Sequence, residues 1–349
     1  MRALPLSSLH RAAGAALAET NGVERVESYG DPSSLARAAR TGVGLLDLSH
    51  RGRLAVVGPD RESWLQGMVT ADVKKLEVGA GCAATVVTVK GKLVAALRIF
   101  KRPDELWIDL DAERVTPTLD HLRRYIVMEE CELVDRSAET AMLSLHGPRA
   151  RTLLGAPQLA EHQQAKLEIG GEEVLAIGSA ELGVEGLDLW LTPGACSAVW
   201  KALLTAGGTP LGFDAAEILR IEAGRPRFGA ELDEDTLPLE AGLERAISYD
   251  KGCYVGQEVI ARIAHRGHVN RKLAGLWISG DAPAPAGATL SQDGKPAGAV
   301  RSSLVSEKLG APIALAYVRR ESLSAGTVLS LPDGRTATVT TLPFGPRVA

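Results

Sequence analysis

The order of expected strands and helices changes at one point in this 349-residue chain. Before Arg271, apolar and β-branched runs alternate with amphipathic segments, and the order strand, helix, strands, helix, strand occurs twice in succession. After Arg271, short β-rich runs follow one another between turns such as Pro332-Asp333-Gly334, and no helical period remains. The pattern predicts an α+β fold class, with two α+β units followed by a small β-barrel or sandwich.

The repeated order and its end also set the expected domain boundaries. A chain of 349 residues is too long for one ordinary core, so two or three domains are expected. We predict a first ferredoxin-like α+β unit over residues 1–137, a second over 138–270, and a C-terminal small β-barrel over 271–349. The polar segment Arg136–Thr140 is the predicted connector between the two α+β units.

The charge and cysteine content exclude several classes of function. A formal net charge of −4 disfavours a general polyanion binder, so no nucleic-acid partner is expected. None of the four cysteines forms a Cys-x-x-Cys pair, and His265 and His268 lack a third ligand at useful spacing, so no metal site is expected. No apolar run approaches the roughly 20 residues of a membrane span. A reducing, cytoplasmic location is expected, or the mitochondrial matrix if the source is eukaryotic.

One cysteine lies in a setting that the other three lack. Cys253 follows Lys251 and precedes a predicted amphipathic helix that runs from about Val259 to Gly267. The helix dipole and the lysine charge both favour a thiolate, which predicts Cys253 and Lys251 as catalytic residues. The alternative is a buried structural cysteine in a tight turn, because free cysteines are often buried. The other residues of this motif are Gly252, Tyr254, Gly256, Gln257 and Glu258.

The octapeptide Lys251–Glu258 resembles the signature of the YgfZ family, folate-binding proteins similar in fold to the aminomethyltransferase (T-protein) of the glycine cleavage system. Further similar segments extend the resemblance from Gly44 to about Leu331. The resemblance implies a three-lobed ring around a central channel that binds tetrahydrofolate or a derivative of it. It also implies a role in assembly or repair of iron–sulfur proteins, with the iron–sulfur assembly machinery or its client proteins as partners.

The same resemblance suggests which residues contact folate. A pterin presents paired N–H donors that one carboxylate can accept, and the glutamyl tail favours arginine. The loop Glu181–Asp188 is similar to a T-protein loop written Gly-Glu-Asp-Gly, although Val184 replaces its first acid. Arg220 matches a T-protein arginine. Solvated surface acids and a helix-end arginine that compensates the dipole are the alternatives. The predicted folate-binding residues are Glu185, Asp188, Arg220, Glu222 and Arg227.

One departure from the T-proteins separates the functional interpretations. Their strand Gly-Gly-Val-Ile-Asp-Asp-Leu carries an aspartate that handles a proton, whereas the matching run Gly91–Leu97 has Ala95 and Ala96 at the two aspartate positions. A classical aminomethyltransferase is therefore not expected. The first expectation is a tetrahydrofolate-binding iron–sulfur maturation factor with Cys253 as its working thiol. The alternatives are a folate-dependent one-carbon transferase of the T-protein type and a non-catalytic folate-binding scaffold.

Overall fold

The computed structural model describes residues 2–345, which form two compact units. The first unit contains the chain up to Val87, Val94–Ala216 and Arg245–Val255. The second contains Thr88–Leu93, Glu217–Glu244 and the chain from Gly256 onward. Each unit is therefore built from separated stretches of sequence, which the linear order of expected elements did not predict.

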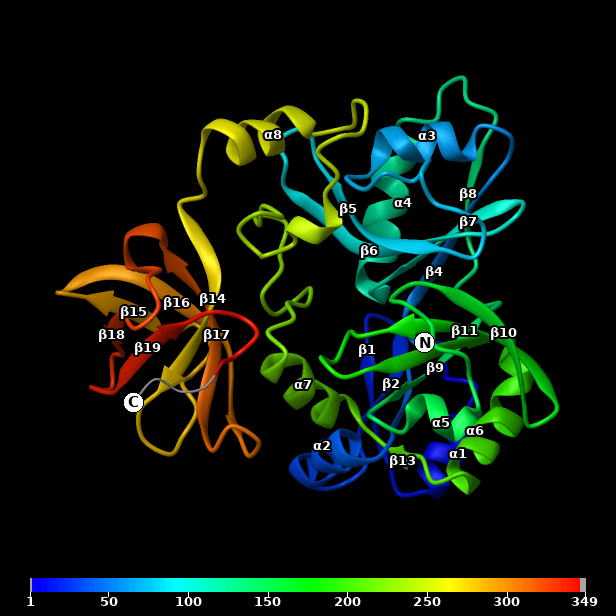
Figure 1. The fold of residues 1–349 in the computed structure, drawn as a ribbon, viewed down its shortest axis with the longest axis horizontal. Coiled ribbons are helices and arrows are strands. Elements are labelled where there is room, and N and C mark those ends of the chain that lie inside the picture. The colour runs from blue at the N-terminus through cyan, green and yellow to red at the C-terminus, as the bar shows by residue number, and fades with distance from the viewer. Residues whose placement is uncertain (1, 346–349) are drawn as a thin grey trace. The chain divides into compact units, whose positions relative to one another are not determined.

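The first unit contains a five-stranded sheet with the order β5-β6-β7-β4-β8 (Figure 1). Its strands are β4 (Gly52–Val57), β5 (Gly81–Val87), β6 (Leu93–Lys101), β7 (Glu105–Leu110) and β8 (Glu132–Asp135). Helices α3 (Arg61–Met68) and α4 (Val115–Arg123) cover one face, where Trp64, Leu65 and Leu122 are buried in one core with strand residues. The amphipathic period of these segments therefore produced the helices that the sequence predicted.

A six-stranded sheet in the same unit has the order β10-β11-β12-β9-β3-β13. Its strands are β3 (Gly44–Asp47), β9 (Ala141–His146), β10 (Gln164–Ile169), β11 (Glu172–Ser179), β12 (Gly186–Leu191) and β13 (Thr209–Pro210). All neighbours are antiparallel except β13 and β3. Strand β3 pairs with β9. Residues 44–47 were expected in the first predicted α+β unit. They belong instead to the sheet formed mainly by the second predicted α+β unit, residues 138–270.

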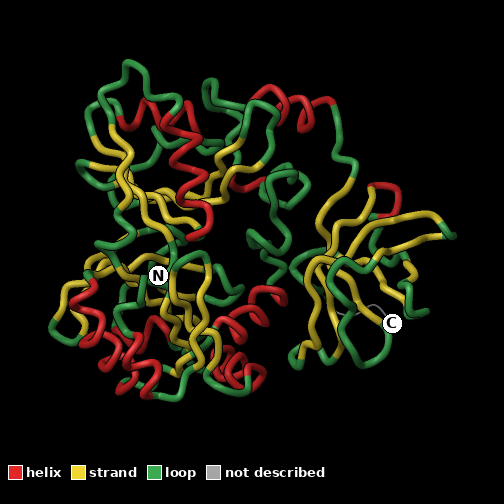
Figure 2. The backbone as a smooth tube through the Cα atoms, turned by 180° about the vertical axis from the view of Figure 1, so that it is seen from behind, coloured by secondary structure: helices red, strands yellow, loops and turns green. Residues whose placement is uncertain are grey.

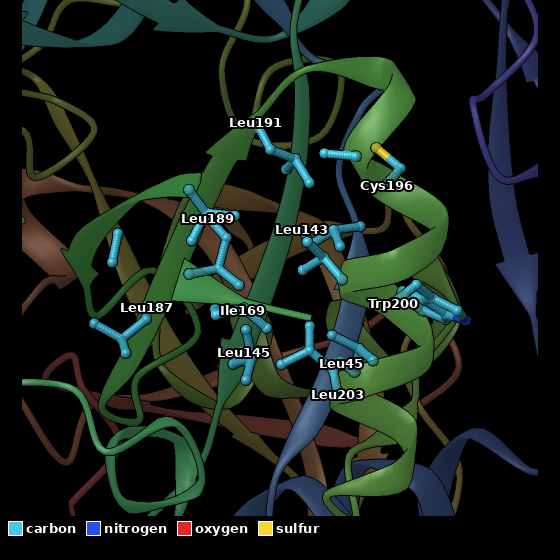
Figure 3. Packing of buried hydrophobic residues seen from close by; sticks show 14 of the residues in the cluster. Leu45, Leu143, Leu145, Ile169, Leu187, Leu189, Leu191, Cys196, Trp200 and Leu203 are labelled. Atoms are coloured by element: carbon cyan, nitrogen blue, oxygen red, sulfur yellow. The ribbon is translucent and has the colours of Figure 1, made fainter. Parts of the chain in front are cut away.

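Helices cover the outer face of this second sheet (Figure 2). They include α1 (Ser7–Ala12), α5 (Ala150–Leu154) and α6 (Cys196–Thr205). Helix α2 (Pro32–Thr41) follows the hairpin of β1 (Ala16–Thr20) and β2 (Val23–Ser28) and contacts β3 and β13. Figure 3 shows the core: Leu187, Leu189 and Leu191 of β12 lie on the side of Trp200 and Leu203 from α6. Alternate residues of a strand point to opposite faces, so Asp188 and Trp190 lie on the other face of β12.

The two sheets pack against each other through that other face. Phe100 and Trp107 of the five-stranded sheet form one buried cluster with Met142, Ile177 and Trp190 of the six-stranded sheet. The rings of Trp107 and Trp190 are 5.6 Å apart, and those of Phe100 and Trp190 are 5.0 Å apart. The first unit is thus a layered structure of helices, sheet, sheet and helices, with an inter-sheet layer whose side chains come from alternate strand positions.

The second unit contains a closed six-stranded barrel, coloured yellow to red in Figure 1, with the order β14-β17-β16-β15-β18-β19. Its strands are β14 (Arg271–Ile278), β15 (Thr289–Gln292), β16 (Lys295–Ser306), β17 (Ala311–Arg319), β18 (Val328–Ser330) and β19 (Thr336–Thr340). Helix α7 (Phe213–Glu222) begins in the first unit and ends in the second, which also holds α8 (Gln257–Arg266). Short 3₁₀ turns occupy Ala112–Arg114, Pro193–Ala195, Glu244–Ala246 and Arg320–Ser322.

The predicted α+β class with a C-terminal small β-barrel is confirmed. Residues 346–349 of the predicted barrel segment lie outside the described residues. The helix predicted from Val259 is also present, and it ends at the C-cap Gly267 as expected. Among residues 2–345, no helix combines the length and apolar character needed to cross a membrane.

Candidate functional site

Cys253 lies in a loop and is exposed to solvent. All four cysteines are among the described residues, and the other three are covered: Cys196 is buried, and Cys82 and Cys131 are partly buried. Burial raises the pKa of the Cys82 and Cys196 thiols to about 12. The interpretation of Cys253 as a buried structural cysteine is therefore wrong. It is the thiol of this chain that a reagent or partner can reach most easily.

The other motif residues differ in burial and in surroundings. Tyr254 is buried, and burial raises the pKa of its hydroxyl to about 12. Gly256 is the N-cap of α8 and has φ +81, a left-handed conformation that side chains with a Cβ rarely adopt. Glu258 pairs with Arg262 at 2.7 Å on the exposed side of α8. Gln257 is the first residue of that helix, whereas nothing in the structure requires glycine at Gly252.

Lys251 does not serve the Cys253 thiol as the sequence predicted. Its ammonium group is buried and donates to three backbone carbonyls, those of Gln66, Val69 (2.7 Å) and Ala71 (2.8 Å). An ammonium has three N–H donors, so this set of carbonyls uses all of them. Burial lowers the pKa of Lys251 to about 8. The thiol whose pKa its charge lowers is that of Cys82, although burial outweighs this effect.

Lys251→Met is expected to destabilise the protein by about 2–3 kcal/mol, because three buried carbonyl oxygens lose their donor. Chemical denaturation measures this change. The matched control is Lys75→Met, because the Lys75 side chain is 72% exposed in its pair with Asp72 and should contribute less than about 1 kcal/mol. If Lys251→Met were as stable as wild type, Lys251 would not be needed for stability, and the result would favour the predicted catalytic role.

A network of charged side chains occupies one part of the inter-sheet layer. Asp109 of β7 is fully buried and binds Arg98 at 2.7 Å, Arg51 at 3.0 Å and Arg53 at 3.0 Å. Burial raises the pKa of Asp109, but the three guanidinium groups outweigh it and hold that pKa well below its ordinary value. Arg98 also binds Asp188 of β12 at 2.5 Å. The network therefore joins the two sheets through buried ion pairs.

Asp188, predicted to contact folate, is thus committed to the protein itself. Its carboxylate accepts from Arg98 and from Ser144 Oγ, and Ser144 in turn contacts His146 Nε2 at 2.8 Å. Serine, histidine and aspartate lie together here, but the serine donates to the carboxylate and all three side chains are buried. Burial lowers the pKa of His146, which favours its neutral form. The arrangement supports the inter-sheet layer and lacks the access that a nucleophile needs.

Ala95 and Ala96 lie on opposite faces of β6. Ala95 is fully buried in the core beneath α3 and α4. Ala96 lies on the inter-sheet face, two residues before Arg98. Neither methyl group can carry a proton, and the charged group that follows Ala96 on this face is a guanidinium.

Arg220 is buried within an ion-pair cluster of the second unit. Its Nε and Nη2 donate to Glu217 at 2.7 and 2.8 Å, and its Nη1 donates to Glu231 at 2.8 Å and to the carbonyl of Arg225 at 2.7 Å. The remaining N–H of Nη2 contacts Ser302 Oγ at 3.5 Å. A guanidinium has five N–H donors, and all five are used. The structure therefore gives Arg220 a supporting role in place of the predicted ligand contact.

The remaining predicted folate residues differ in their surroundings. Arg227 shares Glu217 with Arg220, with its Nε 3.1 Å from the carboxylate. Glu222 is buried and accepts from Ser306 Oγ at 2.6 Å. Glu185 is 63% exposed, and Arg151 is 3.7 Å away. Within the predicted set, Glu185 is thus the carboxylate that solvent, and therefore a ligand, reaches most freely.

Comparisons with known proteins extend over nearly the whole chain. The family model described as the GCVT N-terminal domain matches residues 6–251, and that of the glycine cleavage T-protein C-terminal barrel domain matches residues 271–345. The chain belongs to the glycine cleavage T-protein family. This membership confirms the wider resemblance predicted from the sequence, while the resemblance to YgfZ proteins rests on the octapeptide.

Individual members of the T-protein family agree with this assignment. The aminomethyltransferase of Rubrobacter xylanophilus is 34% identical, covering 99% of this chain and 94% of the relative, and that of Herpetosiphon aurantiacus is 33% identical, covering 99% and 98%. The crystal structure of the aminomethyltransferase T of Bartonella henselae has a TM-score of 0.90 and 24% identity, covering 99% of this chain and 98% of that one, which shows the shared fold. The names of these relatives favour the transferase alternative over the iron–sulfur interpretation.

The sequence alone did not predict the buried network of Arg51, Arg53, Arg98 and Asp109. A signal for it was present, because Arg98 and Asp109 are charged residues within otherwise apolar strands, where a charge must be paired if it is buried. Which charge pairs with which could not be read from the sequence, since Arg51 and Asp109 are 58 residues apart and Arg98 and Asp188 are 90 residues apart.

Proposed function

We propose that this T-protein family member binds a reduced folate and supports the assembly or repair of iron–sulfur proteins, with Cys253 as its working thiol. The observation that carries this proposal is the combination of an exposed Cys253 with alanine at both positions where the resemblance places an acid. A thiolate can attack, exchange or bind a metal, and each of these needs access to the sulfur. The octapeptide Lys251–Glu258 supports the same assignment.

Folate binding is proposed from family membership, and Glu185 fits it best among the predicted residues. Its exposed carboxylate would accept the paired N–H groups of a pterin ring. Asp188, Glu222 and Arg220 are engaged within the protein and would support the surrounding elements. Tetrahydrofolate would supply a carrier for one-carbon groups, and the residues of this chain would bind and orient it.

Aminomethyl transfer is the second candidate, favoured by the relatives named aminomethyltransferase. It requires a group that handles a proton at the folate nitrogen, and Ala95 and Ala96 offer none. Release of ammonia from an aminomethylated lipoyl carrier in the presence of tetrahydrofolate distinguishes the two candidates. Turnover close to that of a T-protein assayed in parallel would reject the first proposal, whereas folate binding by calorimetry without turnover would support it.

Cys253→Ser is expected to abolish biological function and leave stability unchanged, because the side chain is exposed and fills no core space. The measurement is the activity of iron–sulfur enzymes in a deletion strain that carries either the variant or wild type, together with a thermal melt of each protein. Cys131→Ser is the matched control, since it removes a partly buried thiol outside the motif and should retain function.

Alkylation by iodoacetamide gives an independent check on the same thiol. Cys253 is expected to react before Cys82, because burial raises the pKa of Cys82 to about 12 and leaves almost no thiolate there at neutral pH. A stable Cys253→Ser variant that restores iron–sulfur enzyme activity would reject the thiol's role. The folate proposal would then depend on calorimetry alone.

A further inference from the structure

The first unit contains a cavity that residues of both sheets line and that none of the predicted folate or thiol residues lines. Its volume is about 580 Å³, within the range of sites for small organic molecules. The lining includes the indoles of Trp107 and Trp190 together with Val174, Leu175 and Leu191. Aromatic and aliphatic walls of this kind suit a flat apolar ligand.

Arg102, which follows the end of β6, gives this apolar cavity a charge. Its guanidinium carbon lies 4.5 Å from the ring centroid of Trp107 and 5.8 Å from that of Trp190. No hydrogen bond or ion pair to this guanidinium occurs within residues 2–345. Burial lowers the pKa of Arg102, and the charge of the nearby Glu105 counteracts this. Stacking uses the face of a guanidinium and leaves the N–H groups at its edge available.

The other charged residues that line the cavity are paired. Lys101 binds Glu62 at 2.7 Å, Lys166 binds Glu173 at 2.9 Å, and Glu139 binds Arg136 at 2.8 Å. Arg102 therefore remains as the cation of the lining whose donors are not already used by the described residues. An anionic group of a ligand would pair with it in a partly desolvated place, where such pairs are stronger than at the surface.

The two indole N–H groups of the lining are covered by the protein. The Nε1–H of Trp107 is buried and has no acceptor among the described residues, whereas the Nε1–H of Trp190 donates to Met142 Sδ at 3.1 Å. The cavity thus combines two indole rings with a guanidinium edge that no described residue uses.

We propose that this cavity binds a small planar aromatic carboxylate, with the carboxylate at the edge of Arg102 and the ring against Trp107 and Trp190. The site is separate from the strand position at which the T-protein resemblance places its acid. Arg102 follows Ala96 by six residues along β6, a distance of roughly 20 Å in an extended strand. The inference is independent of the folate and thiol proposals.

Calorimetry on the full chain tests the site with 2-naphthoate as the probe and uncharged 2-naphthamide as its control. The naphthoate is expected to bind with a Kd below about 1 mM, and the amide at least about tenfold more weakly, because the charged contact is lost. Arg102→Gln should weaken naphthoate binding about tenfold or more. Lys166→Gln should change it less than about twofold, since that exposed cation is already paired.

Ala165→Trp provides a variant that fills the cavity without removing a charge, because Ala165 lines it. It should abolish naphthoate binding, and a thermal melt shows whether the variant is folded. Absence of binding to wild type at millimolar naphthoate, equal affinity for the amide, or full affinity in Arg102→Gln would each overturn the proposal. Displacement of naphthoate by tetrahydrofolate would also overturn it, since the cavity would then be the folate site.

Discussion

Asp109→Ala is expected to lower the free energy of unfolding by about 3–5 kcal/mol, because it leaves the buried guanidinium groups around it without their shared counter-charge. Asp109 is fully buried, and Arg51, Arg53 and Arg98 all lie within 3.0 Å of its carboxylate. Equilibrium denaturation by urea measures the loss. Asp111→Ala is the matched control: Asp111 is 27% exposed and pairs with Arg51, so its removal should cost less than about 1 kcal/mol.

The pH dependence of stability gives a second test of the same carboxylate. The pKa of Asp109 is lowered in the folded protein, so its contribution is fully present above the unfolded value of about 4 and is lost as the pH falls toward the folded pKa. Wild type should therefore lose more stability than Asp109→Asn between about pH 5 and pH 3. Parallel pH profiles for the two proteins would show that the ion pairs of Asp109 contribute nothing.

Arg220→Met is expected to destabilise the protein by about 3 kcal/mol, because Glu231 would keep its buried charge without a cation. Glu231 is fully buried, and Arg220 Nη1 donates to it at 2.8 Å. Arg220→Lys should recover only part of this loss, since one ammonium cannot reproduce five donors in a fork. Denaturant titration provides the measurement.

The neighbouring Arg225→Lys is the control for this cluster. Arg225 contributes its backbone carbonyl to Arg220, and lysine keeps both that carbonyl and the charge, so its stability should match wild type within about 0.5 kcal/mol. Folate calorimetry on the same variants separates support from direct contact. A stable Arg220→Lys protein that has lost folate affinity would favour the ligand contact predicted from the sequence.

Patterns with a local cause were predictable from the sequence. Apolar runs marked strands such as β7 and β12, and the loss of helical period after Arg271 marked the barrel. Gly267 and the apolar positions after Val259 located α8 to within two residues at its start. The family resemblance at Lys251–Glu258 pointed to a thiol that is exposed in the structure, and its catalytic role stays a prediction.

Pairings over long sequence distances were not predictable. Lys251 was expected to act on its near neighbour Cys253, but its ammonium group reaches carbonyls about 180 residues earlier in the chain. Arg220 was expected to face a ligand because it matches a T-protein arginine, and its partners within the protein could not be recognised in the sequence. Glu217 and Glu231 are three and eleven residues away, and only the folded chain shows that they use its donors. The pairing of β3 with β9 of the six-stranded sheet was not predictable either, because these two strands also lie far apart in the sequence.

The stretch Arg245–Val255 belongs to the first unit, although the residues just before it, Glu217–Glu244, belong to the second. During synthesis the first unit therefore cannot be completed before this stretch has been made. This stretch bonds to the loop that follows α3 through Thr70 Oγ1 to the carbonyl of Ala246 at 2.6 Å, Ser248 N to the carbonyl of Thr70 at 2.9 Å, and the three contacts of Lys251. The ribosome must therefore deliver more than two thirds of the chain before the first unit can close. Contacts between residues so far apart in the sequence slow folding, and this unit cannot be completed until the stretch that carries Cys253 has emerged.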